Sequence, residues 1–353
     1  MALIKLPGLI DIHVHLRDPG QTYKEDFYTG TSSAIAGGFI TVLDMPNNKS
    51  PITTLERLRI KIEEAKKRIV CDVGFYAGSL GDNFLELKKM EPFVFGLKLY
   101  LNKTTGNYLI DKEILTKIFD TWESKKPILV HAESDIIDEV INNVKRTGQK
   151  AHVCHVSTKY ELAAVIQAKE NKLPVTCGVT PHHLFLSKKE AVKLGSFALM
   201  KPKIEEGFKT YLWNKLKYVD VIESDHAPHI VKEKKSVNPP FGVPGLETTL
   251  PLLLTAVSEK KISIKRLIEM CFANPKKIFN IETDKNSFIE VDLNEEYIID
   301  NKKLITKSGW SPFADWKVKG KVKKTIIRGV TVFENDKILV NKSFGKFIKP
   351  ILN

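Results

Sequence analysis

Short apolar runs rich in β-branched residues recur along the first two thirds of the chain. Eight of them have the length and composition of buried parallel strands. These runs are residues 9–14, 39–43, 70–76, 94–99, 127–130, 151–156, 174–179 and 219–222. A stretch of mixed polarity, long enough for a helix, separates most of them.

Three of the intervening stretches carry clear helical patterns. Residues 53–68, 111–125 and 158–171 place apolar side chains at helical spacing. The third opens with Thr158 as a candidate N-cap and has Glu161 in its first turn, which is the pattern of a capping box. Strands that alternate with helices predict βαβ units, and eight repeats predict a closed (β/α)8 TIM barrel in the α/β class.

The pattern changes after residue 280. Residues 288–293, 321–328 and 330–340 resemble antiparallel strands without helices between them. We therefore expect a barrel over residues 8–284 and a small β-rich C-terminal unit, residues 285–353, packed on the barrel.

Composition supports a folded protein that needs no disulfide scaffold. The chain has 353 residues, 42% of them hydrophobic, and this size buries well over half of the unfolded surface. Its four cysteines form no Cys-x-x-Cys pair: Cys71, Cys154, Cys177 and Cys271. No apolar run approaches the roughly 20 residues of a membrane helix. We expect a cytoplasmic protein with no membrane partner.

The charge is concentrated at the C-terminus. The net charge is +13, and residues 301–353 hold 13 basic and 3 acidic residues. A basic face can attract nucleic acid, but these lysines alternate with apolar residues as in solvated strands, and no RNA-binding motif accompanies them. A nucleic-acid-binding module is therefore the weakest of the functional hypotheses.

Metal-binding side chains stand where the predicted strands end. The first run ends with His13 and His15, which share one face because they are two residues apart. His131 follows the fifth run, His155 ends the sixth, and Asp225 follows the eighth. Active sites of barrels form at the carboxyl ends of the strands. This coincidence predicts a metal site, because one or two core histidines would not explain it.

The number of candidate ligands bears on the number of metal ions. Imidazoles and a carboxylate suit zinc, and five such ligands exceed the need of one catalytic ion with an open position. Two ions need a bridging anion. Lys98 ends the fourth run, and its carbamate would be such an anion. From the chemistry alone, however, we favour an ordinary snorkelling or ion-paired lysine there.

An ordered set of motifs resembles a known family. In chain order they are GLIDIHVHLRDPG (8–20), DMPN (44–47), GLKLY (96–100), HAE (131–133), CHVS (154–157), PHH (181–183), SDHAPH (224–229) and FGVPGLETTLPLLLTAVS (241–258). They resemble the dihydroorotases of the amidohydrolase superfamily. The similarity is greatest to the dihydroorotase domain of the animal multifunctional pyrimidine-synthesis polypeptide, and it extends from about residue 6 to past residue 340.

This resemblance implies a reaction and a metal centre. The reaction is the zinc-dependent, reversible cyclisation of N-carbamoyl-L-aspartate to L-dihydroorotate in de novo pyrimidine biosynthesis. Two zinc ions would be bridged by carboxylated Lys98 and by a hydroxide, which would be the nucleophile. This implication differs from the snorkelling or ion-paired Lys98 that chemistry alone favours. Asp225 would also act as the catalytic base and acid. The implied metal ligands are His13, His15, Lys98, His131, His155 and Asp225.

The resemblance also implies a substrate pocket and a lid. Arg17 and Asn47 would hold the substrate carboxylate, since the planar guanidinium suits such a group. The other implied pocket residues are Lys201, His229, Phe241 and Gly242. The polar loop 101–108, with Thr104 and Thr105, would form a mobile lid.

Three positions depart from the family pattern. Thr105 replaces an aromatic residue in the expected lid, and Lys201 replaces an arginine, which makes one bidentate contact impossible. Gly178 stands where an acidic residue is expected. That last departure counts against an extra zinc ion held by Cys154, which on its own has the character of a buried apolar thiol.

Two alternatives to a dihydroorotase stay open. Another cyclic amidohydrolase, an allantoinase or a hydantoinase, would share the barrel and its metal ligands. A catalytically inactive dihydroorotase-like scaffold domain would share the fold but is expected to have lost ligands. We further expect a homodimer, with the chain either free-standing or part of a larger multifunctional protein.

Overall fold

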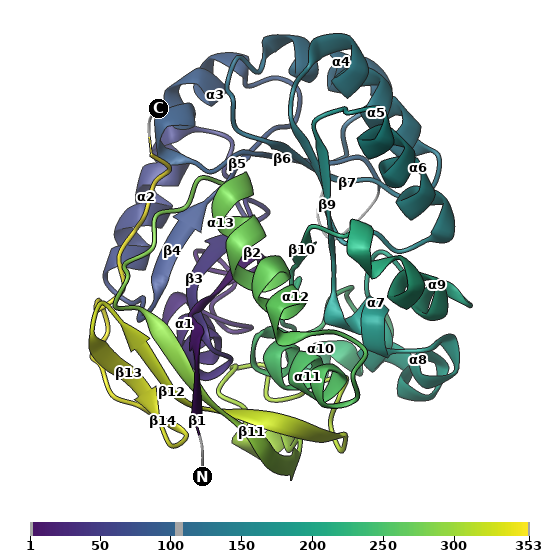
Figure 1. Cartoon of the computed structure of the whole chain (residues 1–353). Helices are drawn as coiled ribbons and strands as arrows, with labels where there is room; N and C mark the ends of the chain where they lie inside the picture. The colour runs from purple at the N-terminus through teal and green to yellow at the C-terminus, as the bar shows by residue number, and fades with distance from the viewer. Residues whose placement is uncertain (1–2, 103–108, 352–353) are drawn as a thin grey trace.

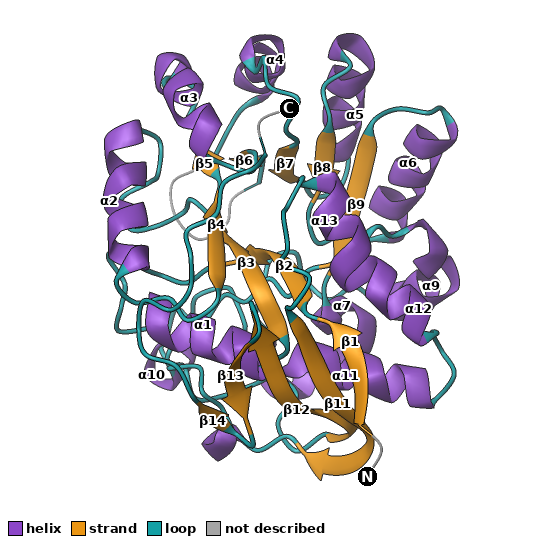
Figure 2. Ribbon diagram, turned by 60° about the vertical axis from the view of Figure 1, so that its left-hand side comes forward, coloured by secondary structure: helices purple, strands orange, loops and turns teal. Residues whose placement is uncertain are grey.

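The computed structural model describes residues 3–102 and 109–351. Its centre is a ring of short parallel strands surrounded by helices (Figures 1 and 2). The strands of this ring are β2 (Leu9–Val14), β3 (Phe39–Asp44), β4 (Asp72–Phe75), β5 (Ala77–Gly78), β6 (Leu97–Tyr100), β7 (Ile128–His131), β8 (Ala151–Val153), β9 (Val175–Val179) and β10 (Val221–Ile222). Eight of these strands overlap the eight predicted runs. The ninth, β5, follows directly after the run at residues 70–76 and was not predicted.

Two junctions turn the strands into a closed barrel. Hydrogen bonds define the parallel sheets β2-β3-β4 and β5-β6-β7-β8-β9-β10. Strand β4 is followed directly by β5, and a parallel bridge between Val14 and His226 joins β2 to the segment after β10. The predicted TIM barrel is thereby confirmed.

Helices cover the outside of the ring, as α2 to α6 show most clearly in Figure 1. The helices are α1 (Phe27–Ala36), α2 (Leu55–Lys66), α3 (Phe84–Met90), α4 (Lys112–Thr121), α5 (Ile136–Thr147), α6 (Lys159–Glu170), α7 (Pro181–Phe185), α8 (Lys188–Leu194), α9 (Phe208–Lys215), α10 (Val231–Lys234), α11 (Leu246–Ser258), α12 (Ile264–Ile268) and α13 (Asn274–Ile278). Within the described ranges, none of these helices is long and apolar enough to cross a membrane.

Side-chain caps set where the predicted helices begin. The side chains of Thr54 and Asp111 accept backbone N–H groups at the starts of α2 and α4. Helix α6 has the expected capping box between Thr158 and Glu161. Each cap satisfies a donor that the first turn leaves without a partner inside the helix.

A second, antiparallel sheet lies beside the barrel (Figure 2). Its order is β1-β11-β12-β13-β14. Its strands are β1 (Leu3–Pro7), β11 (Phe288–Ile298), β12 (Lys317–Ile327), β13 (Val330–Glu334) and β14 (Lys337–Ile338). Strand β1 was not expected, and it pairs antiparallel with β11. The sheet is therefore built mainly, but not wholly, from the C-terminal segment, and the exact division at residues 284 and 285 stays a prediction.

Cross-strand ion pairs neutralise part of the positive charge of the basic C-terminal segment. On β12, Lys317 lies 2.6 Å from Glu296, and Lys323 lies 3.0 Å from Glu295. Lys324 pairs with Glu334 on β13 at 3.0 Å. Charges paired in this way belong to an ordinary solvated sheet face, as the alternating pattern predicted.

The connection between β11 and β12 is anchored on the barrel by Trp310. This side chain is 2% exposed, and its indole N–H donates to the His229 carbonyl at 2.6 Å. Nearby, the buried Glu247 carboxylate accepts the backbone N–H groups of Ile305 and Thr306. Burial raises the pKa of Glu247 to about 7, although these two hydrogen bonds act against the rise. The connection thus packs against the segment that carries His229.

We predict that Trp310→Ala lowers the free energy of unfolding by about 3–5 kcal/mol, because it empties a buried aromatic site. Trp310→Phe is the matched control: it keeps most of the ring and loses only the indole donor, at a cost of about 1–3 kcal/mol. Urea unfolding measures both. Equal midpoints for the two variants would contradict a packing role for this side chain.

Candidate metal centre and substrate pocket

A cavity opens at the carboxyl ends of the barrel strands. It is lined by His13, His15, Arg17, Asn47, Tyr100, His131, His155, Lys201, Asp225, Ala227, Phe241 and Gly242. Ten of these are sequence-predicted site residues. Two other predicted residues, Lys98 and His229, are not among the residues that line it. Thr104 and Thr105, the predicted lid residues, lie outside the described ranges.

The first group of candidate ligands comes from β2 and the segment after β10. Donor atoms of His13, His15 and Asp225 all lie within 4.8 Å of one another, and the three residues are buried. The Asp225 Oδ1 atom is 3.1 Å from His15 Nε2 and 3.4 Å from His13 Nε2. Two imidazoles and a carboxylate therefore converge on one point, as the sequence predicted.

Burial and the nearby charges shift the pKa values of this group in opposite directions. Burial and the nearby Lys98 lower the pKa of His13, but the Glu223 and Asp225 carboxylates outweigh them and raise it to about 10. Burial opposes ionisation of Asp225, yet His13 and His15 hold the pKa of its carboxyl below its ordinary value. Burial lowers the pKa of His15 to about 4. The site thus combines an anionic carboxylate with at least one neutral imidazole.

His131 and His155 form a second group. His131 Nδ1 lies 3.1 Å from His155 Nε2. Burial lowers the pKa of both imidazoles, that of His155 well below its ordinary value. Two neutral imidazole nitrogens at this separation can bind one zinc ion, because Zn–N bonds are about 2.0–2.1 Å long. On its other side, His131 Nε2 lies 3.0 Å from Glu133 Oε1.

Lys98 is fully buried on β6. Its Nζ donates to Cys154 Sγ at 3.0 Å and lies 5.1 Å from the centre of the Tyr100 ring. Within the described ranges, no carboxylate forms a salt bridge with this amine. The snorkelling or ion-paired lysine that chemistry alone favoured is therefore not what the structure contains.

Three site residues adopt a backbone conformation that is uncommon outside glycine. The φ angles are 61° for Arg17, 37° for His155 and 45° for Asp225. Such angles cost free energy and concentrate at functional sites. Here each one turns the chain sharply at the end of a barrel strand and aims a side chain at the cavity.

A cationic wall lies beside the metal ligands. Arg17 Nε donates to the Pro228 carbonyl at 3.2 Å, and Lys24 Nζ lies 3.2 Å from His229 Nδ1. His229 Nε2 lies 2.9 Å from the Phe241 carbonyl. Burial, followed by the charges of Arg17 and Lys24, lowers the pKa of His229 below its ordinary value. Arg17 Nη2 also lies 3.2 Å from His229 Nε2, so this nitrogen faces both a donor and an acceptor.

The loops that carry Arg17 and Asn47 are tied to one buried lysine. Lys61 Nζ lies 2.7 Å from Asp44 Oδ2 and donates to the Met45 carbonyl at 2.8 Å. The other oxygen of Asp44 accepts the Leu16 N–H at 2.7 Å. This ion pair therefore holds the end of β2 next to the end of β3. Asn47 itself contacts the site, with Oδ1 2.6 Å from His15 Nδ1.

Lys201 reaches the cavity from the opposite side. Its Nζ is 3.8 Å from Glu133 Oε1 and 5.6 Å from the centre of the Phe241 ring. It can offer one point charge to a ligand, whereas Arg17 can offer a planar pair of donors.

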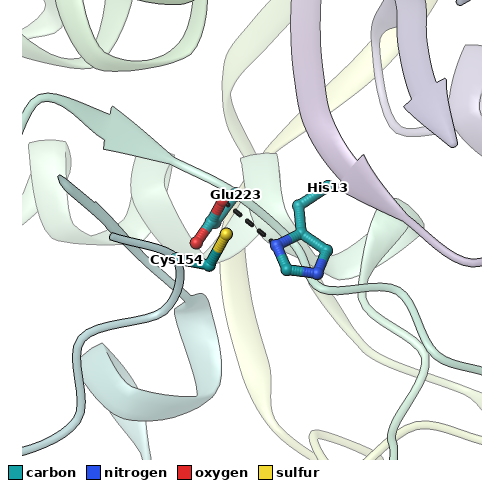
Figure 3. Close-up of side chains that lie close together, drawn as sticks. All are labelled: His13, Cys154 and Glu223. Carbon is teal, nitrogen blue, oxygen red and sulfur yellow. Dashed lines mark hydrogen bonds and ion pairs between the residues drawn. The ribbon is translucent and has the colours of Figure 1, made fainter. Parts of the chain in front are cut away.

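Five residues of this region were not predicted as site residues: Lys24, Tyr100, Glu133, Glu223 and Ala227. Tyr100 and Glu133 stand within quoted motifs but received no role. Glu223 precedes Asp225 by two residues, so the spacing rule that paired His13 with His15 could have identified it. It is fully buried, and its Oε2 lies 3.3 Å from His13 Nδ1, as the dashed line in Figure 3 marks.

Together, the closed barrel and the buried imidazoles and carboxylates at its strand ends define a (β/α)8-barrel protein with a candidate metal centre. The Amidohydrolase family matches residues 4–332, and the chain belongs to this family. The resemblance expected from the motifs is thereby confirmed.

Relatives and solved structures agree with this assignment. The chain is 39% identical to the multifunctional protein CAD of Squalus acanthias, over 98% of its own length and 16% of that protein. It is 37% identical to the dihydroorotase of Pyrococcus furiosus, over 98% of this chain and 85% of that one. It thus spans about one sixth of the multifunctional relative and most of the shorter one.

The similar solved structures include a hydantoinase and a domain described as inactive. The L-hydantoinase of Arthrobacter aurescens has a TM-score of 0.94 and 26% identity, with 98% of this chain and 89% of that chain covered. The inactive dihydroorotase-like domain of a CAD-like protein from Chaetomium thermophilum has a TM-score of 0.85 and 23% identity, with 99% and 100% covered. The second similarity concerns the fold alone.

We predict that Lys61→Ala lowers the free energy of unfolding by about 3–5 kcal/mol, because Asp44 is left as a buried charge without a partner. The double variant Lys61→Met/Asp44→Asn removes both charges at nearly constant volume and is expected to lose much less. Thermal and urea unfolding test this. The ion-pair explanation is wrong if the double variant is as unstable as Lys61→Ala.

Proposed function

We propose that the chain catalyses the dihydroorotase reaction, the reversible interconversion of N-carbamoyl-L-aspartate and L-dihydroorotate. The observation that carries this proposal is the cavity itself, which joins metal-type ligands to a buried guanidinium at Arg17. The 37% identity to a dihydroorotase over 85% of its length supports the same conclusion.

The side chains at the cavity fit a pair of zinc ions. His13, His15 and Asp225 would hold one ion, and His131 and His155 the other, with carboxylated Lys98 between them. The buried amine of Lys98, which no described carboxylate pairs with, supports the carbamate. Zinc in such a site supplies Lewis acidity toward the amide carbonyl and makes water a good nucleophile near neutral pH.

Asp225 is suited to move the proton. In ring opening, water adds to the amide carbonyl carbon, the C–N bond breaks, and the ring nitrogen gains a proton. Asp225 takes that proton from water and delivers it to nitrogen, and ring closure reverses both transfers. The lowered pKa of Asp225 keeps the carboxylate in the basic form at neutral pH.

The cationic wall suits an acidic substrate. Arg17 is 5% exposed and faces the cavity, where it can donate two parallel hydrogen bonds to a carboxylate. Asn47 adds a neutral amide and Lys201 adds positive charge, whereas Lys24 is paired with Glu233 at 3.1 Å. His229, with main-chain groups of Phe241 and Gly242, would complete the pocket around the pyrimidine ring. A hydantoinase, whose simplest substrates carry no carboxylate, has no need of this wall.

A catalytically inactive scaffold is the second candidate, because one similar solved structure is of this kind. Loss of metal ligands would favour it. Here all six proposed ligands are present, and five of them line one cavity. We therefore favour an active enzyme.

Assembly and location are proposed from the family resemblance. A homodimer in the cytoplasm is our expectation. The other arrangement is a domain of a larger pyrimidine-synthesis protein, since the chain matches only 16% of the multifunctional relative.

Turnover of L-dihydroorotate, measured together with zinc content, tests the proposal. We expect about two zinc ions per chain and loss of ultraviolet absorbance as the ring opens. Lys98→Ala is the matched control and is expected to lose most of its zinc and its turnover. Zinc without turnover of dihydroorotate, but with turnover of hydantoin or allantoin, would reassign the substrate. Absence of both zinc and turnover would favour the scaffold.

We predict that Arg17→Ala raises KM for L-dihydroorotate by about 10–150-fold, the loss of a charge-assisted contact worth about 1.5–3 kcal/mol. Zinc content is expected to stay at the wild-type value, because Arg17 forms hydrogen bonds with Pro228 and His229 and with none of the proposed metal ligands. Arg17→Lys keeps the charge and loses the planar fork, so an intermediate KM is expected. Unchanged kinetics for Arg17→Ala would remove this residue from the pocket.

A further inference from the structure

Glu223 is a fully buried carboxylate directly behind the proposed metal centre. It follows β10 and lies 0% exposed. Its Oε2 is 3.3 Å from His13 Nδ1 and 3.6 Å from His152 Nε2. Its Oε1 accepts the backbone N–H of His155. One carboxylate thus touches a proposed ligand of each zinc ion.

Gly178 provides the space for this carboxylate. A Cβ atom placed on Gly178 would lie 2.5 Å from Glu223 Cδ and 2.6 Å from Oε1, which is far inside van der Waals contact. Gly178 is absent from the glycines with positive φ, so its backbone does not demand glycine. The missing side chain on β9 and the extra carboxylate after β10 therefore form one complementary pair.

The contact to His13 decides which nitrogen of that ring faces the centre. Nδ1 faces Glu223, and Nε2 lies 3.4 Å from Asp225 Oδ1, on the cavity side. A carboxylate that accepts from one ring nitrogen fixes the tautomer and the ring orientation and leaves the other nitrogen free for a metal ion. The hydrogen bond to His155 fixes the backbone where φ is 37°.

We propose that Glu223 is a positioning residue of the metal centre, which holds His13 and His155 in their ligand geometry, and that Gly178 is glycine in order to admit it. This inference rests on the proposed metal-dependent function. It also changes the interpretation of Gly178 as the loss of an acidic residue. The acidic group that the family pattern places on β9 is instead supplied from the segment after β10.

Glu223 has one competing role, that of a direct ligand. Donor atoms of His13, Cys154 and Glu223 lie within 4.8 Å of one another (Figure 3). Yet Cys154 Sγ already receives a hydrogen bond from Lys98 at 3.0 Å, and Glu223 lies at direct hydrogen-bond distance from His13. These contacts satisfy the three groups without an ion, so we favour positioning.

The test compares zinc binding in three variants, by competition with a chromogenic chelator, by metal count at saturation, and by thermal melting of the metal-free protein. Glu223→Gln keeps the shape but loses the charge, and Gly178→Ala pushes the carboxylate away. Both are expected to weaken zinc binding by about 10–100-fold, while the count stays at about two per chain. Asp292→Asn, a buried carboxylate in β11, is the control and is expected to bind zinc like the wild type.

A relocated carboxylate separates positioning from a merely structural role. In Gly178→Asp/Glu223→Ala, the new carboxyl group grows from β9 into the space that Glu223 vacated. We expect this double variant to bind zinc at least tenfold more tightly than Glu223→Ala. Failure of this rescue, in a variant whose metal-free form melts cooperatively, would overturn the inference.

Other outcomes are equally decisive. Wild-type zinc affinity in Glu223→Gln would overturn the positioning role while the metal-dependent function stands. Three zinc ions per wild-type chain, falling to two in Glu223→Gln, would make Glu223 a ligand and overturn positioning as well. A wild-type protein that binds no zinc would overturn the proposed function together with this inference.

Discussion

The site depends on the closure of the barrel between its first and last strands. The His15 N–H donates to the His226 carbonyl at 2.8 Å, and the neighbouring Val14–His226 bridge completes the ring. These contacts join segments about 210 residues apart. Because they lie beside His13, His15 and Asp225, the same hydrogen bonds that close the barrel also bring the first group of candidate ligands together. Without closure, the histidine pair would be an ordinary feature of a strand end.

Closure at this point buries charged groups, and the structure compensates those of Asp44 and Glu223 locally. Lys61 neutralises Asp44. Asp44 also accepts the Leu16 backbone N–H, and Lys61 also donates to the Met45 carbonyl. Glu223 is balanced by His13 and by the backbone of His155. Buried charges are stable only when they are paired and hydrogen-bonded. The strained angles at Arg17, His155 and Asp225 are tolerated because these surroundings hold them in place.

The departures from the family pattern have different physical meanings. The glycine at 178 lies against Glu223, which brings a carboxylate near His13 from the segment after β10. Lys201 is not matched in this way. It keeps a positive charge near the cavity, but an ammonium cannot reproduce a bidentate contact. Its neighbour Glu133 also contacts His131, which links this side of the pocket to the second group of ligands.

By itself, the sequence determined the barrel, its strand ends and most of the cavity, because alternating strands and helices leave few topologies and the carboxyl ends of parallel strands must meet. His13, His15, His131, His155 and Asp225 could be placed by that rule alone. Only the tertiary structure decided that β1 joins the second sheet, that Lys24 stands behind His229, that Lys98 has a thiol for a partner, and that Glu223 fills the space beside Gly178. These are contacts between side chains distant in the chain, and no local pattern encodes which of them will share one buried volume.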